Sequence, residues 1–364
     1  MAGTTTVPAD WLIDTVTGVF RGGGLSERAA RTVAESLVVA DMRGTASHGV
    51  LLVPMYLRRL RDRSVTTLER AEVVVDWGAV AVLDARHALG QLTGDQAMEI
   101  AVAKARTHGV GAVTVRHAFH FGAAARYAAT AAAAGCVGVA AANTRPLMPA
   151  PGGAEPVTGN NPLAIAVPRS GRAPVVLDMA LSEAALGKIR LAAQENRPIP
   201  AHWATDAQGR PTTDPQAALA GMLLPAAGPK GYGLALAIDV LAGVLSGGAY
   251  GSGVNGLYKD TAVPNDCAHF FLALDVAAFG DPGRFAERLE DLLGQVTGAR
   301  RAPGTDRLLL PGQLEESRAA AAREKGVPVS DGALRAVLEE AERAGLALPL
   351  PPGVAVGGQR RADD

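Results

Sequence analysis

Gly111-Ala112-Val113-Thr114-Val115 begins the stretch that decides the fold class. An alanine-rich run starts at Ala123, and Val137-Gly138-Val139-Ala140-Ala141 follows it. The short apolar, valine-containing runs predict two strands, and the alanine-rich run predicts a helix between them. Because strands and helices alternate, the sequence indicates an α/β or α+β core. The same alternation continues on both sides, with strands expected at 73–75, 80–83, 163–167, 175–177 and 269–274 and helices at 91–108 and 231–245.

Both ends of the chain are predicted to be helical. Residues 8–43 have the apolar spacing of two helices, with Ser26 able to cap the second, and a third helix carries Tyr56 to Leu60. The polar, proline-containing residues 190–221 predict a surface loop with little regular structure. Helical ends around a mixed middle predict that the two termini pack together and that the middle forms a separate unit. Further helices are expected over 315–325 and 331–344, after a loop at 298–306.

The composition argues against several classes of partner. The 364-residue chain has a formal net charge of -1 and only 4% aromatic residues, so neither nucleic acid nor an anionic membrane is an expected partner. The first residues lack a basic segment followed by an apolar one, which predicts no signal peptide. Cys136 and Cys267 lie in or beside apolar runs without metal-ligand spacing, so two reduced, buried thiols are expected. These features together predict a cytoplasmic protein.

Ser47-His48-Gly49-Val50 is the first candidate for catalysis. It follows an apolar-periodic stretch that ends in Ala40-Asp41-Met42-Arg43-Gly44. An imidazole just past a helix end titrates near neutral pH and can give or take a proton. The pair gains weight from glycine- and asparagine-rich segments further along the chain, which look like a surface for a phosphate-bearing cofactor.

His117-Ala118-Phe119-His120-Phe121-Gly122 lies between a predicted strand and the alanine-rich helix. Free backbone N–H groups at such a helix start attract phosphate, and small residues permit close approach. Two other interpretations stay open: a tight structural turn, or a His-x-x-His zinc pair for which no further ligands are evident. Gly251-Ser252-Gly253-Val254-Asn255-Gly256 matches a dinucleotide-binding pattern, but it follows a predicted helix, so we interpret it as a loop and expect no Rossmann fold.

Three further segments could contact a nucleotide. Gly159-Asn160-Asn161-Pro162 supplies unusual backbone angles and side-chain amides, which suit a ribose or an amide and equally suit plain turns. Asp178 ends a predicted strand, where a carboxylate often bonds a sugar hydroxyl or caps the next helix. Lys230 follows Gly228-Pro229 at a helix start, where it is either a phosphate contact or a solvated lysine.

These segments, in this order, resemble the malate/L-lactate dehydrogenase family of NAD(P)-dependent 2-oxoacid reductases. The resemblance runs from Val7 to about Gly326 and implies a non-Rossmann α/β (α+β) fold. Residues 73–298 are then a mixed-sheet NAD(P)-binding domain, and the helical parts 1–72 and 299–364 pack together. Besides the motifs above, the resemblance is carried by Asn143-Thr144, Pro151-Gly152-Gly153, Leu177-Asp178-Met179-Ala180, Gly187-Lys188-Ile189, Lys230-Gly231-Tyr232-Gly233-Leu234 and Leu310-Pro311-Gly312.

The resemblance also implies roles for single residues. His48 is expected to donate or accept the proton with Ser47 orienting it, His120 is a second candidate for that role, and Lys188 matches the lysine of hydroxy-acid dehydrogenases. The cofactor is expected to be NADP or NAD, with NADPH favoured, the chain to be a homodimer with its active site in a cleft between domains, and no metal is expected. The expected cofactor-binding residues are His120, Phe121, Gly122, Ala123, Ala124, Asn143, Thr144, Gly159, Asn160, Asn161, Asp178, Met179, Ala180, Gly228, Lys230, Gly231, Arg307, Pro311 and Gly312.

Two departures from the family pattern bear on the substrate. Relatives usually carry an arginine four residues after the first histidine to grip the substrate carboxylate, whereas Leu52 cannot form paired charge-assisted bonds. Arg58 and Arg59 are expected one to two helical turns further on, and Ala227-Gly228-Pro229 replaces the more usual Gly-Gly-His. We therefore expect hydride transfer to the C=O or C=N carbon of a non-standard small 2-oxoacid, ketone or cyclic imine. The alternative is a catalytically retired member that acts as a binding or scaffold protein.

Overall fold

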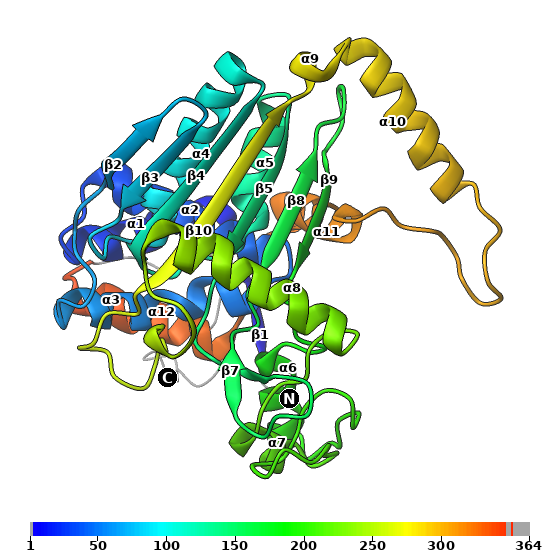
Figure 1. Ribbon diagram of the computed structural model, residues 1–364. Coiled ribbons are helices and arrows are strands. Elements are labelled where there is room, and N and C mark those ends of the chain that lie inside the picture. The colour runs from blue at the N-terminus through cyan, green and yellow to red at the C-terminus, as the bar shows by residue number, and fades with distance from the viewer. Residues whose placement is uncertain (1–2, 347–350, 352–364) are drawn as a thin grey trace.

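The computed structural model describes residues 3–346 and residue 351. Its centre is a seven-stranded sheet with the order β2-β3-β4-β10-β5-β8-β9 (Figure 1). β3 and β4 run parallel and the other neighbours run antiparallel, so the sheet is mixed, as the resemblance implied. The strands are β2 (Glu72–Trp77), β3 (Val80–Asp84), β4 (Val110–Ala118), β5 (Cys136–Ala142), β8 (Leu163–Val167), β9 (Val175–Met179) and β10 (Cys267–Asp275).

Helices α4 (Gly90–His108) and α5 (Ala125–Ala133) pack against one face of this sheet (Figure 1). Glycines in the strands allow the helices to approach closely. A Cβ on Gly111 would lie 1.9 Å from the carbonyl oxygen of Ala101, and a Cβ on Gly138 would lie 2.5 Å from that of Ala128. The predicted strand, helix and strand between residues 111 and 141 are therefore confirmed, and small residues set the spacing of the two layers.

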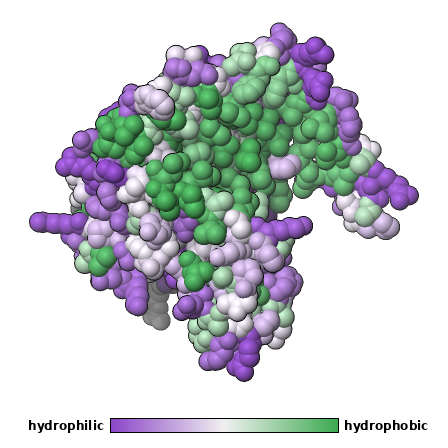
Figure 2. Space-filling view, in the orientation of Figure 1, coloured by the Kyte–Doolittle hydropathy of each residue, from purple (hydrophilic) through white to green (hydrophobic). Residues whose placement is uncertain are grey.

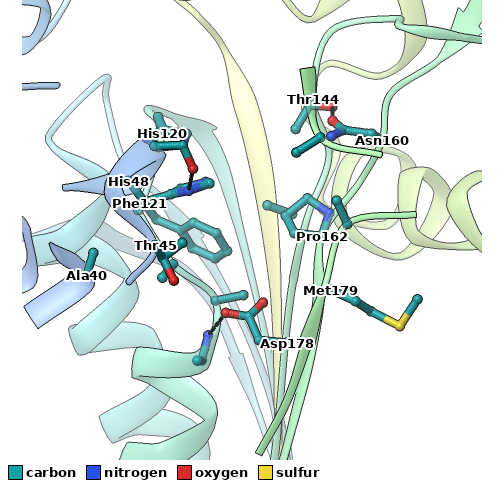
Figure 3. A pocket seen from close by; sticks show the side chains of 18 of the residues that line it. Ala40, Thr45, His48, His120, Phe121, Thr144, Asn160, Pro162, Asp178 and Met179 are labelled. Atoms are coloured by element: carbon teal, nitrogen blue, oxygen red, sulfur yellow. Dashed lines mark hydrogen bonds between the residues drawn. The ribbon is translucent and has the colours of Figure 1, made fainter. Parts of the chain in front are cut away.

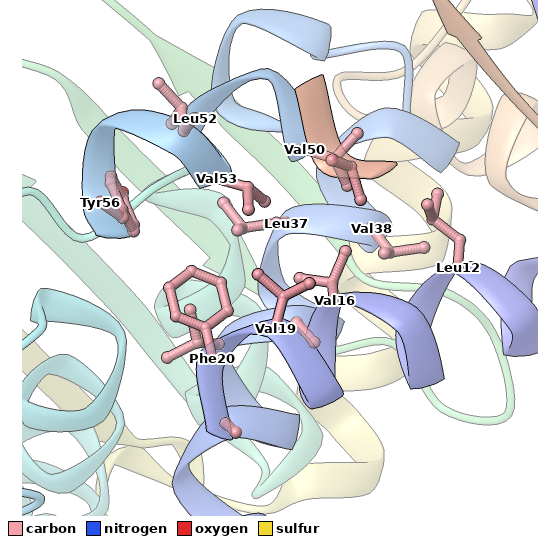
Figure 4. Packing of buried hydrophobic residues seen from close by; sticks show 14 of the residues in the cluster. Leu12, Val16, Val19, Phe20, Leu37, Val38, Val50, Leu52, Val53 and Tyr56 are labelled. Carbon is pink, nitrogen blue, oxygen red and sulfur yellow. The ribbon is translucent and has the colours of Figure 1, made fainter. Parts of the chain in front are cut away.

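The two ends of the chain pack together beside the sheet. β1 (Thr4–Val7) pairs antiparallel with β11 (Val327–Ser330). Ser26 caps its helix as predicted, because its Oγ accepts a hydrogen bond from the Ala29 N–H at 3.2 Å. Leu52 lies inside the apolar core of this region and is 2% exposed. This core contains buried residues of α1 (Ala9–Gly22), α2 (Glu27–Met42), α3 (Val53–Arg61), α11 (Gln313–Lys325) and α12 (Asp331–Arg343). Figure 4 shows part of it, where Leu12, Leu37 and Tyr56 come from α1, α2 and α3.

The domain boundaries at residues 72 and 298 stay a prediction. Within the C-terminal part predicted to span 299–364, residues 347–350 and 352–364 lie outside the described residues. The loop expected at 298–306 is confirmed, because α10 (Pro282–Thr297) ends just before it. Neither α10 nor the short α9 (Val276–Phe279) was predicted, and Figure 1 shows α10 projecting away from the body of the molecule.

A smaller apolar core lies near the lower end of the molecule in Figure 1. It contains buried residues of α6 (Leu186–Gln194) and α7 (Pro215–Ala220). The expectation of a loop over 190–221 is therefore wrong at both ends of that segment. Helices of nine and six residues are too short to show a clear helical period in the sequence. Two short strands, β6 (Met148–Pro149) and β7 (Pro156–Thr158), form a separate ladder.

Helix α8 (Pro229–Asp239) continues through η3, a π-helical turn at Val240–Val244, which confirms the helix predicted over 231–245. Most of its large apolar residues do not face the core. Ile238 is 2% exposed, whereas Leu241 and Leu245 are 38% and 59% exposed. Figure 2 shows a broad apolar surface on this side of the molecule. The segment 251–256 is a loop with a single 3₁₀ turn, η4 (Gly251–Gly253), as interpreted from its context.

Both cysteines are buried and free, as expected, although Cys267 also lines the cleft described below. Among the helices of the described ranges, none combines the length and apolarity needed to cross a bilayer. The cytoplasmic location stays a prediction.

Candidate active site

A cleft of about 770 Å³ is lined by both the N-terminal helical region and the sheet. Its two sides carry different residue types. Figure 3 shows Asp178 low in the cleft, between the two sides. On one side lie Thr45, His48, His120 and Phe121, and on the other lie Thr144, Asn160, Pro162 and Met179 (Figure 3).

His48 ends the 3₁₀ turn η1 (Ala46–His48), which is followed by a second turn, η2 (Val50–Leu52). The buried carboxyl of Asp41 fixes this hairpin of turns, because its Oδ2 accepts a hydrogen bond from the Val50 N–H at 2.8 Å. A Cβ on Gly49 would lie 2.1 Å from Asp41 Oδ1, so glycine is required there. Burial raises the pKa of Asp41 to about 7. Ser47 Oγ lies 3.0 Å from His48 Nδ1, which fits the orienting role expected for the serine.

His120 stacks against His48, with ring centroids 5.4 Å apart and planes inclined by 24°. Tyr56 Oη lies 2.7 Å from His120 Nδ1, and Gln91 Nε2 donates to the same phenol at 3.0 Å. Donation of the phenol hydrogen to Nδ1 would leave the proton of a neutral His120 on Nε2. Burial, followed by the charge that His48 would carry, lowers the pKa of His120 to about 3. Burial also lowers the pKa of His48.

Asp178 is the next-to-last residue of β9 and faces the start of α5. Its Oδ2 accepts a hydrogen bond from the Ala125 N–H at 3.1 Å, and the side chain remains open to the cleft (Figure 3). The surrounding protein raises its pKa to about 6, mainly by desolvation. A carboxylate beside an alanine- and glycine-lined helix start can accept hydrogen bonds from ribose hydroxyls, while the adjacent backbone can approach a phosphate.

Comparison with known proteins assigns the family. The family model described as malate/L-lactate dehydrogenase matches residues 7–338. The chain belongs to this family. The malate dehydrogenase of Pyrococcus abyssi is 33% identical over 349 residues, which cover 93% of this chain and 95% of the relative. The ureidoglycolate dehydrogenase (NAD(+)) of Escherichia coli K12 is 35% identical over 318 residues, covering 87% and 90%.

A solved structure agrees with the sequence relatives. The Δ1-piperideine-2-carboxylate reductase of Pseudomonas syringae pvar. tomato superposes with a TM-score of 0.83 at 30% identity, covering 92% of this chain and 99% of that one. The names of the relatives include both NAD(+) and NADP(+) enzymes. The fold, the family and the oxidoreductase class expected from the sequence are therefore confirmed.

The cleft of this dehydrogenase brings together most of the residues expected from the sequence. The expected residues that line it are Ser47, His48, His120, Phe121, Gly122, Ala123, Ala124, Asn143, Thr144, Asn160, Asp178, Met179, Ala180, Pro311 and Gly312. The others, Gly159, Asn161, Lys188, Gly228, Lys230, Gly231 and Arg307, do not line it. The catalytic and cofactor-binding roles of both sets stay predictions.

The residues outside the lining have visible structural surroundings. Asn161 is buried and accepts a hydrogen bond from the Thr144 N–H at 2.9 Å, so it supports the lining from behind. Lys188 lies on α6 between two lining residues, Leu186 and Arg190. Because residues four apart share a helix face, position 188 points the other way, and its ammonium lies 6.0 Å from the ring centre of Trp203.

The zinc interpretation of the two nearby histidines is not supported by their contacts. His117 Nδ1 lies 2.9 Å from Asp84 Oδ2, while His120 bonds Tyr56. Within the part of the chain that the structure describes, no three His, Cys, Asp or Glu side chains gather in a metal-binding arrangement.

Sequence reasoning missed a loop that lines the cleft. Residues 255–258 contribute Asn255, Gly256, Leu257 and Tyr258 to it. The loop is anchored by Arg59, which is 0% exposed and donates to the carbonyls of Leu257, Val263 and Gly256 at 3.0, 2.8 and 2.8 Å. Arg59 therefore does not replace the arginine missing at position 52. Its contacts are separated by about 200 positions in the chain, so no local pattern could reveal them.

Proposed function

We propose that this dehydrogenase transfers hydride between a nicotinamide dinucleotide and the C=O or C=N carbon of a small 2-oxoacid, ketone or cyclic imine, with His48 handling the proton. The observation that supports it most is the stacked pair of His48 and His120 in a cleft that also holds Asp178. A proton and a hydride must leave or reach one carbon–heteroatom pair, which requires an acid/base group beside the hydride carrier.

The cleft residues fit a dinucleotide. The small residues 122–125 leave backbone accessible, and Asp178 offers a carboxylate oxygen toward the same space. In this proposal Asp178 holds a ribose hydroxyl and the helix start at 124–125 faces a phosphate. The nicotinamide, when bound, supplies or accepts the hydride.

In this proposal the two histidines have different roles toward the substrate oxygen or nitrogen: His120 donates a hydrogen bond to it, and His48 exchanges a proton with it. Lowered pKa values make both imidazoles neutral at pH 7. His120 has its Nδ1 occupied by Tyr56, so it offers an Nε2–H that can hold the substrate oxygen or nitrogen. His48 then takes the proton of an alcohol or amine during oxidation and returns it during reduction.

The test is oxidation of NADH and NADPH by the wild type, His48→Ala and His120→Ala, against a panel of 2-oxoacids and cyclic imines. Loss of an acid/base group should lower kcat about 10²–10⁴-fold in His48→Ala. Tryptophan fluorescence should show that this variant still binds the cofactor. An active His48→Ala enzyme would remove the assigned role, and failure of the wild type to bind either nicotinamide would favour the scaffold alternative.

We also propose that the chain is a homodimer through its open apolar surface. On α8 and η3, Leu236, Val240 and Val244 are 46%, 48% and 50% exposed, alongside Leu241 and Leu245. Contiguous exposed apolar surface of this kind typically marks a protein interface (Figure 2). Light scattering should give twice the chain mass for the wild type and one chain mass for Leu241→Asp/Val244→Asp. Val73→Asp, on the edge strand β2, serves as the control, and a monomeric wild type would overturn the proposal.

We expect the choice between NAD and NADP to depend on the charged residues around Asp178. The sequence-based preference for NADPH stays a prediction. Arg43 lines the cleft and pairs with Glu316 at 3.1 Å, and Glu315 also lines the cleft. Parallel titrations with NADH and NADPH decide between them.

A further inference from the structure

Two arginines on the cleft surface carry charges that no acidic group neutralises. Arg145 and Arg190 both line the cleft with exposed side chains. Among the described residues neither forms an ion pair, and the hydrogen bond that Arg145 donates to the Pro146 carbonyl is long, at 3.4 Å. Arg43, by contrast, is paired with Glu316. The unpaired charges of Arg145 and Arg190 are therefore available to a ligand.

Both arginine side chains lie against one short loop, residues 256–258. A Cβ on Gly256 would lie 3.1 Å from Arg145 Cδ and 3.5 Å from its Nε, so the arginine stem crosses this glycine. The Arg190 guanidinium carbon lies 5.9 Å from the ring centre of Tyr258. Although Arg145 is exposed at the cleft surface, partial desolvation by the cleft walls, and then the like charge of Arg190, lowers its pKa. Arginine nevertheless stays protonated, so an anion placed between the two groups would relieve their repulsion.

This loop lies at the histidine end of the cleft. Leu257 packs against the buried cluster that contains Tyr56 and Phe119. The Arg59 guanidinium, which donates to the Leu257 carbonyl, lies 5.6 Å from the ring centre of Phe119, the neighbour of His120. Tyr56 in turn bonds His120. The loop is also anchored, because Arg59 donates hydrogen bonds to the Gly256 and Leu257 carbonyls. The arginine pair is thus presented on a fixed surface near the proposed acid/base group.

We propose that Arg145 and Arg190 bind the acid group of the substrate, a carboxylate or sulfonate. This inference rests on the proposed function and narrows its substrate class to anionic 2-oxoacids or imino acids. Guanidinium groups hold such anions through paired, charge-assisted bonds that leucine cannot make. The carboxylate clamp that relatives carry at position 52, where Leu52 is buried in the helical core, is supplied from α6 and from the loop after β5.

Calorimetric titration of the enzyme–NADH complex with malonate tests the pair without requiring turnover. Removing both guanidinium groups, in Arg145→Ala/Arg190→Ala, should weaken malonate binding at least about tenfold, because hydrogen bonds to charged groups are lost. The double lysine variant should recover part of it, since charge without the planar fork gives weaker binding. Arg172→Ala, a 68% exposed arginine elsewhere, is the matched control and should bind like the wild type.

Two further measurements distinguish a site for the acid group of the substrate from a site for the cofactor pyrophosphate. The double alanine variant should raise KM for anionic substrates by a similar factor while the Kd of NADH stays unchanged. Equal malonate binding in the wild type and the double variant, or no binding in either, overturns the proposal. A matching loss of NADH affinity also overturns it, because the pair would then serve the cofactor pyrophosphate. Arginine-dependent malonate binding in an enzyme that reduces nothing would support the anion site and refute the proposed reaction.

Discussion

Arg59→Met removes the clamp on the 256–263 loop and keeps an unbranched apolar stem at position 59. Arg59 donates to the carbonyls of Gly256, Leu257 and Val263 at 2.8–3.0 Å, to the Asp260 carbonyl at 3.3 Å and to Ser64 Oγ at 3.1 Å. Methionine is apolar and donates none of these bonds. The carbonyl oxygens of the loop therefore lose their charged partner, while methionine can still pack where the aliphatic stem of the arginine lies.

The number and quality of these bonds set the magnitude. A hydrogen bond from a charged donor contributes about 1.5–3 kcal/mol, and such contributions do not add fully within one network. Breaking a buried charged network typically costs about 3–5 kcal/mol. Since each 1.4 kcal/mol is about tenfold, the opening equilibrium of the loop should rise at least about 100-fold.

Hydrogen–deuterium exchange measures that opening directly. Amides in 256–263 should exchange at least about 100-fold faster in Arg59→Met, while amides of β4 and β5 exchange as in the wild type. The control is Arg58→Met, next to it on α3, whose side chain is 69% exposed and 3.8 Å from Asp62. Unchanged exchange in the loop would refute the clamp. Equal acceleration throughout the sheet would show global destabilisation in its place.

Three other substitutions test separate parts of the site. Asp41→Asn removes a buried carboxyl whose pKa is raised from 3.8 to about 7 in the folded protein. The raised pKa stabilises the folded wild type below pH 3.8, and this contribution is lost as the pH rises to about 7. In chemical denaturation, the free energy of unfolding of the variant should therefore gain about 1 kcal/mol or more on that of the wild type between pH 4 and pH 8, and a pH-independent difference would contradict this. Asp178→Asn should weaken the binding of NADH more than that of NADPH in fluorescence titrations. The adenosine ribose loses a charged hydrogen-bond acceptor in both cases, but NADPH also escapes the repulsion between the carboxylate and its 2′-phosphate; equal losses would place Asp178 away from the adenosine ribose. Tyr56→Phe leaves His120 Nδ1 and the Gln91 amide without their phenol and should lower the free energy of unfolding by about 1–3 kcal/mol, with a lower kcat, whereas an unchanged kcat would show that the phenol does not orient His120.

Local patterns in the sequence carried the architecture of the sheet and of the helical ends. The strands around residues 111–115 and 137–141 were predictable because valine-rich runs and an alanine-rich helix have distinct local signals. Helices α6 and α7 were not, since each is too short to establish a period. The apolar register of α8 was visible, but whether its leucines face a core or the outside depends on packing that the sequence does not express.

In the candidate site, too, residues with a local sequence signal were predictable and residues placed by packing were not. Residues that belong to a motif, such as His48 and Asp178, were found from the sequence and do line the cleft. Lys188 was found by resemblance, but Arg190, two positions further on, is the residue that lines the cleft. Two residues along a helix are separated by about 200° of rotation, so the two side chains point in nearly opposite directions.

The residues that sequence reasoning missed act through contacts between distant segments. Tyr56 reaches His120 across 64 positions, and Arg59 reaches the 256–263 loop across about 200. Replacing the expected arginine by Leu52 removes a local signal for carboxylate binding, but a charge can reach the same space from any segment that lines it. In our proposal the substrate preference depends on which cations the fold brings into the cleft, and Arg145 and Arg190 are the arginines without an acidic partner among the described lining residues.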